Sequence, residues 1–243
     1  MTDEKLEQLL KQALYQPIND KDITVKVKEN KMKLLSARKI VAAVAVVCIL
    51  GGTGAFAAGH ISQLISGEEK VYKQYTQMES VQKKAGFDVK SVESFGDGFK
   101  FKEASIINTK KADDDGNVLG SYKEIGIHYQ NQSHGQVSLY MFEEENYMAG
   151  ESKHLETKNI NGVEVEVQKQ KYKFVPTDYK LTAEDKEAQK DGSIEISYGT
   201  DKVEEEEKGF VTWSQDNIIY EIVVTLGDTT MEDAFALCKA LTK

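Results

Sequence analysis

Cysteine and proline are scarce in this chain of 243 residues, which contains only two of each. Two cysteines, Cys48 and Cys238, are too few for a framework of disulfide bonds or for a zinc knuckle. Two prolines exclude proline-rich and collagen-like architectures. Hydrophobic residues make up 40% of the chain and charged residues 29%, which is typical of a folded globular protein rather than a disordered one.

Signatures of catalysis and of cofactor binding are also absent from the sequence. It contains no nucleophile elbow, no HExxH zinc motif, no phosphate-binding P-loop and no dinucleotide fingerprint. Histidine occurs only four times, and the spacing suggests neither a metal cage nor a catalytic dyad: His60, His128, His134 and His154. We therefore predict that the protein is not an enzyme and that it holds no metal and no cofactor.

One acidic segment partly matches a calcium-binding loop. Asp113, Asp115, Asn117 and Glu124 occupy positions 1, 3, 5 and 12 of such a loop. The glycine required at position 6 is Val118, however, and the flanking segments alternate like strands rather than helices. We therefore interpret this segment as a hairpin turn.

Basic residues are fewer than acidic residues: the chain has 31 Lys and Arg but 40 Asp and Glu, which gives a net charge of −9. A general nucleic-acid-binding protein carries a basic surface, so we predict no nucleic-acid partner. The deficit is uneven: residues 1–39 contain nine basic and six acidic residues, whereas residues 60–243 contain 22 and 34. The chain therefore has a basic N-terminal part and a strongly acidic C-terminal part.

A single uncharged stretch, from Ile40 to Ala58, separates the two parts. Its 19 residues would form a helix about 28 Å long, close to the thickness of the hydrocarbon core of a bilayer. We therefore predict a transmembrane helix over residues 40–59. A buried core helix is the weaker interpretation, because a soluble helix of this length normally shows a polar stripe. Cleavage after Ala57 stays open, since Ala55-Phe56-Ala57 matches a signal-peptidase pattern.

Flanking charges predict the orientation of this stretch. Six basic residues lie between Lys26 and Lys39, whereas the first fully charged residue on the other side is Glu68. The positive-inside rule therefore places the N-terminus in the cytoplasm and the C-terminal part outside the cell membrane. The spacings Gly51–Ala55 and Gly54–Ala58 permit close helix pairing, and hence a homodimer through the span.

The cytoplasmic part, residues 1–39, is too short to form a core of its own. Between Thr2 and Pro17 its leucines recur at helical spacing, which predicts a short amphipathic helix. Such a helix is marginally stable alone in water, so its apolar face needs a partner. We predict that it docks on a cytosolic protein; a position on the membrane surface and a disordered tail are the alternatives. The docking face comprises Leu6, Leu9, Leu10 and Leu14.

The outer part is predicted to be an α+β domain over residues 68–243, which follows a linker over residues 60–67. Ser66 and Glu69 match a capping box and predict a helix that ends at Gly86. Alternating apolar residues then predict an antiparallel β-sheet, and Thr182 is expected to cap a short charged helix. Thr229 or Thr230 is expected to cap a C-terminal helix. Turns are predicted at residues 113–117, 131–135, 161–162 and 216–217.

The C-terminal 50 residues carry a more specific pattern. A strand over Ile194–Gly199 precedes Gly209–Trp213, a turn, Tyr220–Ile222 and an amphipathic helix. This pattern resembles a C-terminal extracytoplasmic domain of unassigned function in membrane-anchored proteins of Gram-positive bacteria, some of which are labelled anti-sigma-factor-like. The layout of cytoplasmic helix, single span and outer domain is similar as well. One difference is that residues 1–39 contain no His or Cys, so the zinc site common in anti-sigma proteins is missing.

Two functions fit these features. The first is a single-pass membrane regulatory or sensor protein, in which an outer event alters how the cytosolic helix meets a partner such as a sigma factor. The second is a membrane-anchored extracytoplasmic binding or envelope protein with no cytosolic signalling role. They differ in whether the leucines of residues 1–39 bind a protein.

Overall fold

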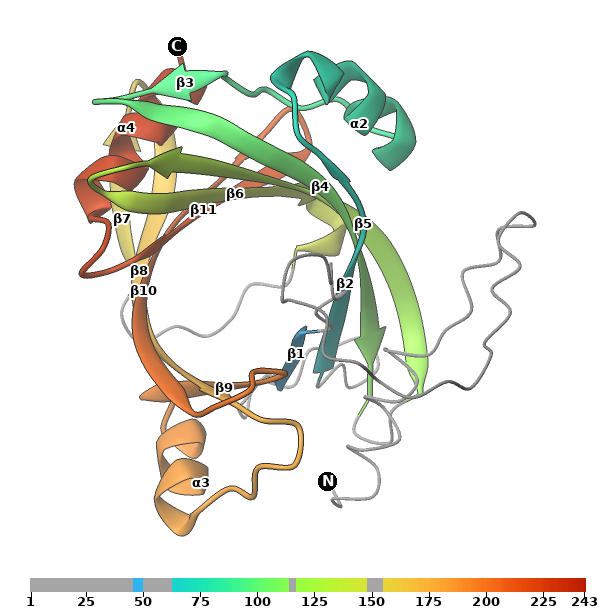
Figure 1. Ribbon diagram of the computed structural model, residues 1–243, viewed down its shortest axis with the longest axis vertical. Coiled ribbons are helices and arrows are strands. Elements are labelled where there is room, and N and C mark those ends of the chain that lie inside the picture. Colours follow the sequence, from blue (N-terminus) through green and yellow to red (C-terminus); the bar gives the residue numbers. More distant parts are fainter. Residues whose placement is uncertain (1–45, 50–62, 114–116, 148–154) are drawn as a thin grey trace, which may run out of the picture.

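The computed structural model describes residues 46–49, 63–113, 117–147 and 155–243 (Figure 1). They form one strongly curved sheet with three short α-helices in the described part. The strands pair in the order β10-β11-β6-β5-β4-β2-β1-β9-β8-β7, and β10 also pairs with β8, so the sheet curves back on itself. Among these strands β8 and β9 run parallel and the other pairs are antiparallel. The predicted α+β class, dominated by an antiparallel sheet, is confirmed.

The described elements have the following bounds. The strands are β1 Val46–Ile49, β2 Gln63–Tyr72, β3 Ser94–Phe95, β4 Phe99–Ala112, β5 Val118–Asn131, β6 Gly135–Glu143, β7 Glu156–Ile160, β8 Val163–Val175, β9 Ile194–Tyr198, β10 Glu204–Gln215 and β11 Ile218–Thr225. The helices are α2 Met78–Ala85, α3 Ala183–Lys190 and α4 Met231–Leu241, with short 3-10 turns η1 Tyr75–Gln77 and η2 Glu144–Asn146.

The main hydrophobic core lies between the sheet and two helices. The helices α2 and α4 lie on the outer side of the curved sheet (Figure 1). Alternate residues of the long strands are buried with them in one core. On β5 these residues are Ile125, Ile127 and Tyr129, all fully buried. From α4, Leu237 and Cys238 are fully buried in the same core, as expected for the apolar face of the C-terminal helix. Cys238 is a free thiol whose pKa burial raises to about 11, so it behaves as a small apolar side chain.

Turn and cap residues act where the sequence predicts them. Asp216 and Asn217 both have positive φ, of 54° and 62°, as a two-residue turn between antiparallel strands requires. Asn161 and Gly162 make the same kind of turn between β7 and β8. Thr182 and Thr230 each accept a hydrogen bond from the backbone three residues later and begin α3 and α4.

The predicted helix from Ser66 to Gly86 is wrong in its first half. Residues from Gln63 to Tyr72 instead form β2, which pairs with β4, and α2 begins only at Met78. Pairing with β4 runs along this segment, interrupted at Glu69, and buries Ile65 and Tyr72. A capping box at Ser66 cannot offset these contributions. Gly86 does end the helix, in the left-handed conformation. Because β2 begins at Gln63, part of the segment assigned to a linker belongs to the sheet.

Of the predicted transmembrane segment, only Val46–Ile49 lies within the described residues. These four residues form β1, a strand that pairs with β2 on one side and β9 on the other, rather than a turn of helix. Three of the four are β-branched, which favours an extended backbone. In the part of the chain that the structure describes, no helix has the length and hydropathy needed to cross a membrane. The rest of the segment, and the predicted cytosolic helix, lie outside it.

Trp213 gives a test of this core. Its ring is 3% exposed and stacks on Tyr220 with 5.0 Å between ring centroids. Replacing Trp213 by Ala should lower the free energy of unfolding by about 3–5 kcal/mol, through lost burial and a residual cavity. Urea denaturation measures the change. Trp213→Phe should cost much less, because it keeps an aromatic ring and removes an indole N–H that has no partner among the described atoms. Equal losses for the two variants would contradict this account.

Candidate functional site

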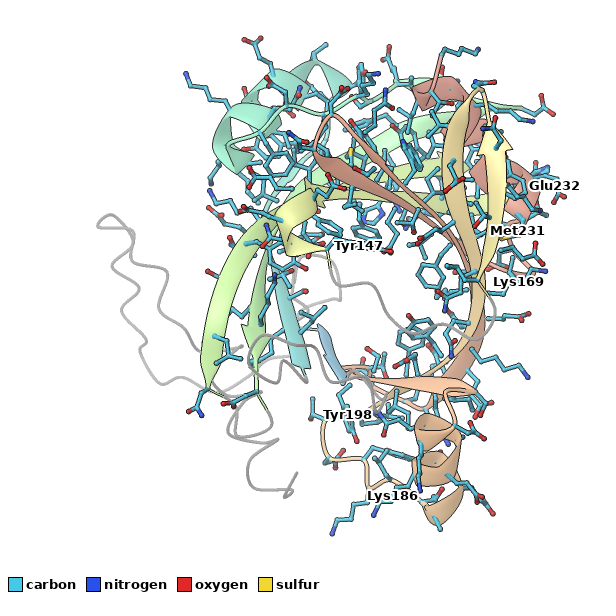
Figure 2. All side chains as sticks on the ribbon, turned by 180° about the vertical axis from the view of Figure 1, so that it is seen from behind. Tyr147, Lys169, Lys186, Tyr198, Met231 and Glu232 are labelled. Carbon is cyan, nitrogen blue, oxygen red and sulfur yellow. The ribbon has the colours of Figure 1, made fainter. Side chains whose placement is uncertain are left out.

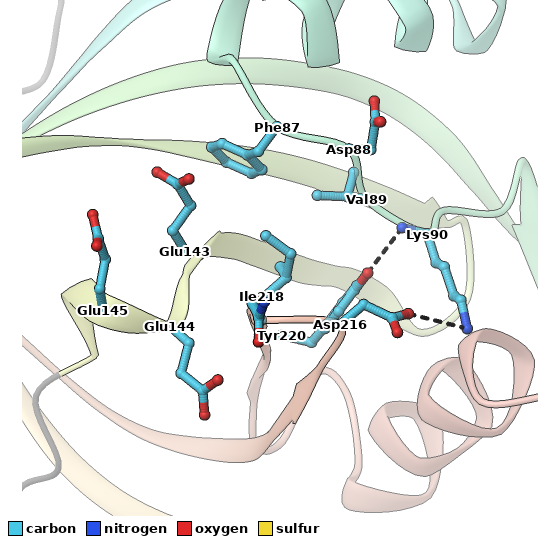
Figure 3. Close-up of a pocket in the computed structure, with 11 residues that line it drawn as sticks. Phe87, Asp88, Val89, Lys90, Glu143, Glu144, Glu145, Asp216, Ile218 and Tyr220 are labelled. Atoms are coloured by element: carbon cyan, nitrogen blue, oxygen red, sulfur yellow. Dashed lines mark hydrogen bonds and ion pairs between the residues drawn. The ribbon is translucent and has the colours of Figure 1, made fainter.

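A cleft with a volume of about 840 Å³ opens at the edge of the main core (Figure 3). It lies between the segment that follows α2 and the turn between β10 and β11. Its apolar lining comes from Phe87, Val89 and Ile218. Five carboxylate side chains surround this lining, and we call the whole feature the acidic cleft: Asp88, Glu143, Glu144, Glu145 and Asp216.

Backbone contacts hold the two walls of the acidic cleft together. The Lys90 amide donates to the Tyr220 hydroxyl over 2.9 Å, and the Glu144 amide donates to the carbonyl of Asn217 over 2.9 Å. Lys90 is the one cationic side chain in the lining, and its Nζ lies 3.9 Å from Asp216. Five carboxylates against one ammonium make the local potential negative. The cleft therefore suits a cationic partner.

A second group of polar side chains lies on the opposite face of the sheet. Ser105, Tyr140 and the Cβ position of Gly126 approach one another on this side, which faces away from α2 and α4. Strand register extends the row, because Tyr140 is directly opposite Glu221, Glu221 opposite Thr212 and Thr212 opposite Glu166. Glu124, two residues before Gly126, is on the same side. We call this side the inner face.

Hydrogen bonds anchor two of the three carboxylates of the inner face. Thr109 donates to Glu124 over 2.5 Å, and Tyr147 donates to Glu166 over 3.0 Å. Tyr147 follows η2 and lies on the inner side of the curve (Figure 2). Glu221 makes no hydrogen bond or ion pair with any residue that the structure describes. Glu124, Glu166 and Glu221 are each partly exposed, so solvent reaches this face.

Burial changes the acidity of these groups. It raises the pKa of Glu221 to about 7, and the nearby Glu124 charge adds to the shift. Burial also raises the pKa of Glu124, although hydrogen bonds from Thr109 and Tyr122 oppose the change. Tyr140 has its pKa raised to about 12, mainly by burial and also by the surrounding carboxylates. The inner face is therefore a region where negative charge is costly without a counter-charge.

Sequence-predicted site residues fall into two groups. Leu6, Leu9, Leu10 and Leu14 lie outside the described residues, so the docking face stays a prediction. Asp113 caps the turn after β4, because it accepts hydrogen bonds from both the amide and the side chain of Asn117 at 2.8 and 2.9 Å. Glu124 points instead to the inner face, far along β5 from that turn. The interpretation as a hairpin turn is therefore confirmed.

His128 also has a structural explanation. Its Nδ1 lies 2.9 Å from the hydroxyl of Ser138, and burial lowers the pKa of the ring. Such a histidine is neutral and hydrogen-bonded at neutral pH, which fits its expected place in a strand.

Glu166 and Glu221 were not singled out from the sequence, and Glu124 was considered only as position 12 of the rejected calcium-loop pattern. Each is an acidic residue in an alternating strand, which normally indicates a solvent-exposed face. The sequence feature that could have indicated these site residues is the mixture of Tyr, Thr and Glu on the polar side of neighbouring strands. That mixture becomes a cluster only once the strand register is known.

Comparisons with protein-family models, with curated proteins and with solved structures found no match to this chain. The acidic cleft and the inner face, together with the sequence pattern outside them, are therefore the features of this chain that bear on its function. Both features carry negative charge on a chain that is itself acidic.

The raised pKa of Glu221 predicts how stability depends on pH. An unfolded Glu titrates near 4.3, whereas Glu221 titrates at about 7 in the folded state. Between these values the folded state binds more protons than the unfolded state, so the free energy of unfolding should fall as pH rises from about 4.5 to 7. Glu195, whose pKa burial also raises to about 7, contributes in the same direction.

Glu221→Gln should remove part of this slope and stabilise the fold above pH 7 by roughly 1 kcal/mol or more. Urea denaturation at several pH values measures both the slope and the change in the free energy of unfolding. Glu143→Gln, in the exposed cleft, is the control and should leave the slope unchanged. An unaltered slope in the Glu221 variant would show that Glu221 is solvated in the folded state.

Proposed function

We propose that the protein is a single-pass membrane regulatory or sensor protein with an anti-sigma-factor-like layout, and not an enzyme. The described sheet is its extracytoplasmic domain, and the leucine face of residues 1–39 docks on a cytosolic protein. The charge asymmetry around Ile40–Ala58 supports this topology. The acidic cleft supports an interaction role for the outer domain, because it combines apolar lining with five carboxylates.

The position of β1 is the main constraint on this proposal. Val46–Ile49 pair with β2 and β9 in the structure, whereas a membrane helix would remove the same residues from the sheet. A peptide segment cannot satisfy its backbone in both ways at once. The proposal therefore requires that β2 and β9 lose β1 when the segment enters the bilayer. The remaining strand pairs, from β2 through β4, β5, β6 and β11 to β10, do not involve β1.

Membrane insertion and orientation can be tested together. The chain should stay in the membrane fraction after alkaline carbonate extraction, because a spanning helix is released only by detergent. A reporter that is active only in the cytoplasm should be silent when it is fused after Lys243. Release of the chain by carbonate would instead favour the arrangement with β1 in the sheet. An active reporter would reverse the orientation.

An alternative is a membrane-anchored extracytoplasmic binding or envelope protein whose residues 1–39 only anchor it. The specific observation in its favour is that both acidic features, the cleft and the inner face, belong to the outer domain. Under this alternative no cytosolic partner exists. The two proposals therefore predict different outcomes for the leucine face.

Leu9→Asp and Leu10→Asp should each abolish capture of a cytosolic partner if the leucine face docks on a protein. A charge placed in a buried apolar contact costs several kcal/mol, a large part of the roughly 8 kcal/mol of a micromolar complex. Affinity purification of the full chain and its variants from crosslinked cells measures capture.

Lys5→Ala and Lys11→Ala are the matched controls, because they change the polar face of the same helix. They should leave capture intact, and all four variants should stay in the membrane. If the aspartate variants capture the same protein as the unchanged chain, residues 1–39 are a passive leader and the envelope-binding alternative is favoured.

A further inference from the structure

We propose that the inner face of the sheet binds a linear organic polycation, of the aliphatic diamine or polyamine class, through Glu124, Glu221 and Glu166. This inference concerns only the described domain. It holds whether or not residues 40–58 cross a membrane.

The spacing of the three carboxylates suits a ligand with several separated charges. Glu221 and Glu166 lie in one cross-strand row with β10 between them, so their Cα atoms are roughly 10 Å apart. Glu124 and Glu221 are separated by β6 in the same way and are offset by two residues. The two terminal ammonium groups of a chain-like amine can therefore bridge two neighbouring carboxylates of the three. Among the described residues no three His, Cys, Asp or Glu side chains are close enough to hold a single metal ion.

Two groups in the row lack the partners that buried polar atoms normally have. The Glu221 carboxylate has none among the described residues, although burial raises its pKa to about 7. The Ser105 hydroxyl is fully buried and has no hydrogen-bond partner in the described structure. Its oxygen lies on the inner face beside the Tyr140 ring, since both closely approach the Cβ position of Gly126, at 3.2 and 3.4 Å. Unsatisfied acceptors of this kind are suited to an ammonium donor.

Among the described residues, no cation forms an ion pair with Glu221. Lys208 on β10 binds Glu206 and Thr225, and lies over the ring of Phe174. Lys111 on β4 binds Asn146 and lies over the ring of Tyr122. Both lysines already have partners at other positions. A ligand cation would therefore supply a charge that the inner face lacks.

Aromatic rings lie beside two of the three carboxylates of the inner face. Tyr140 lies directly opposite Glu221, and Tyr122 is close enough to hydrogen-bond to Glu124. Ring faces attract ammonium groups and also cover the methylene chain between them. This arrangement of carboxylates and tyrosines favours an amine over a hydrated inorganic cation, which would gain little from the rings.

Titration calorimetry of the purified full chain in detergent, with spermidine at pH 8, tests the proposal. Glu221 is then ionised, since its pKa is about 7. We expect saturable binding that is much tighter than that of butylamine, which has one charge. Glu221→Gln and Glu124→Gln should each raise the dissociation constant for spermidine by about tenfold, or 1.4 kcal/mol.

Glu232→Gln, at an exposed position in the first turn of α4 on the outer side of the curve, is the matched control for general attraction to an acidic protein. It should change the dissociation constant by less than about twofold. Spermidine should also raise the melting temperature of the unchanged chain more than that of Glu221→Gln, which shows in the same experiment that the variant folds. Equal weakening by the Glu232 and Glu221 variants, or no preference for spermidine over butylamine, would overturn the proposal.

Discussion

The register between β4 and β5 is the constraint on which the rest of the described structure depends. These are the longest strands, and each places alternate side chains on opposite faces. One face carries Ile125, Ile127 and Tyr129 into the core below α2 and α4. The other carries Glu124 and the inner-face polar groups. A shift by one residue would exchange the two sets, so the same pairing specifies both the core and the charged face.

The two acidic regions differ in physical character although both carry negative charge. In the acidic cleft the carboxylates are exposed and solvated, so they attract a partner at little cost to the fold. On the inner face Glu124 and Glu221 are only partly exposed, and burial raises the pKa of both. Keeping a carboxylate there costs folding free energy that a core of apolar side chains would not.

The hydrophobic segment around β1 has two competing ways to satisfy its backbone. In the sheet, Val46–Ile49 use hydrogen bonds to β2 and β9; in a bilayer a helix would use hydrogen bonds within itself. Its β-branched residues are compatible with both, because they favour strands and also partition into lipid. The surroundings of the segment, rather than its own propensity, decide between the two. Insertion of this segment into a bilayer would leave the edges of β2 and β9 without β1.

Local chemistry in the sequence determined the turns, the caps and most strands. Asp216-Asn217, Asn161-Gly162, Thr182 and Thr230 specify their conformations through their own side chains and backbone preferences. Alternation of apolar residues between the turns predicted the antiparallel sheet. Only the tertiary structure decided that residues 63–72 form a strand, because pairing with β4 outweighs a local capping signal. It alone brought Ser105, Glu124, Glu166 and Glu221 to one face, since cross-strand neighbours are set by register between segments far apart in sequence.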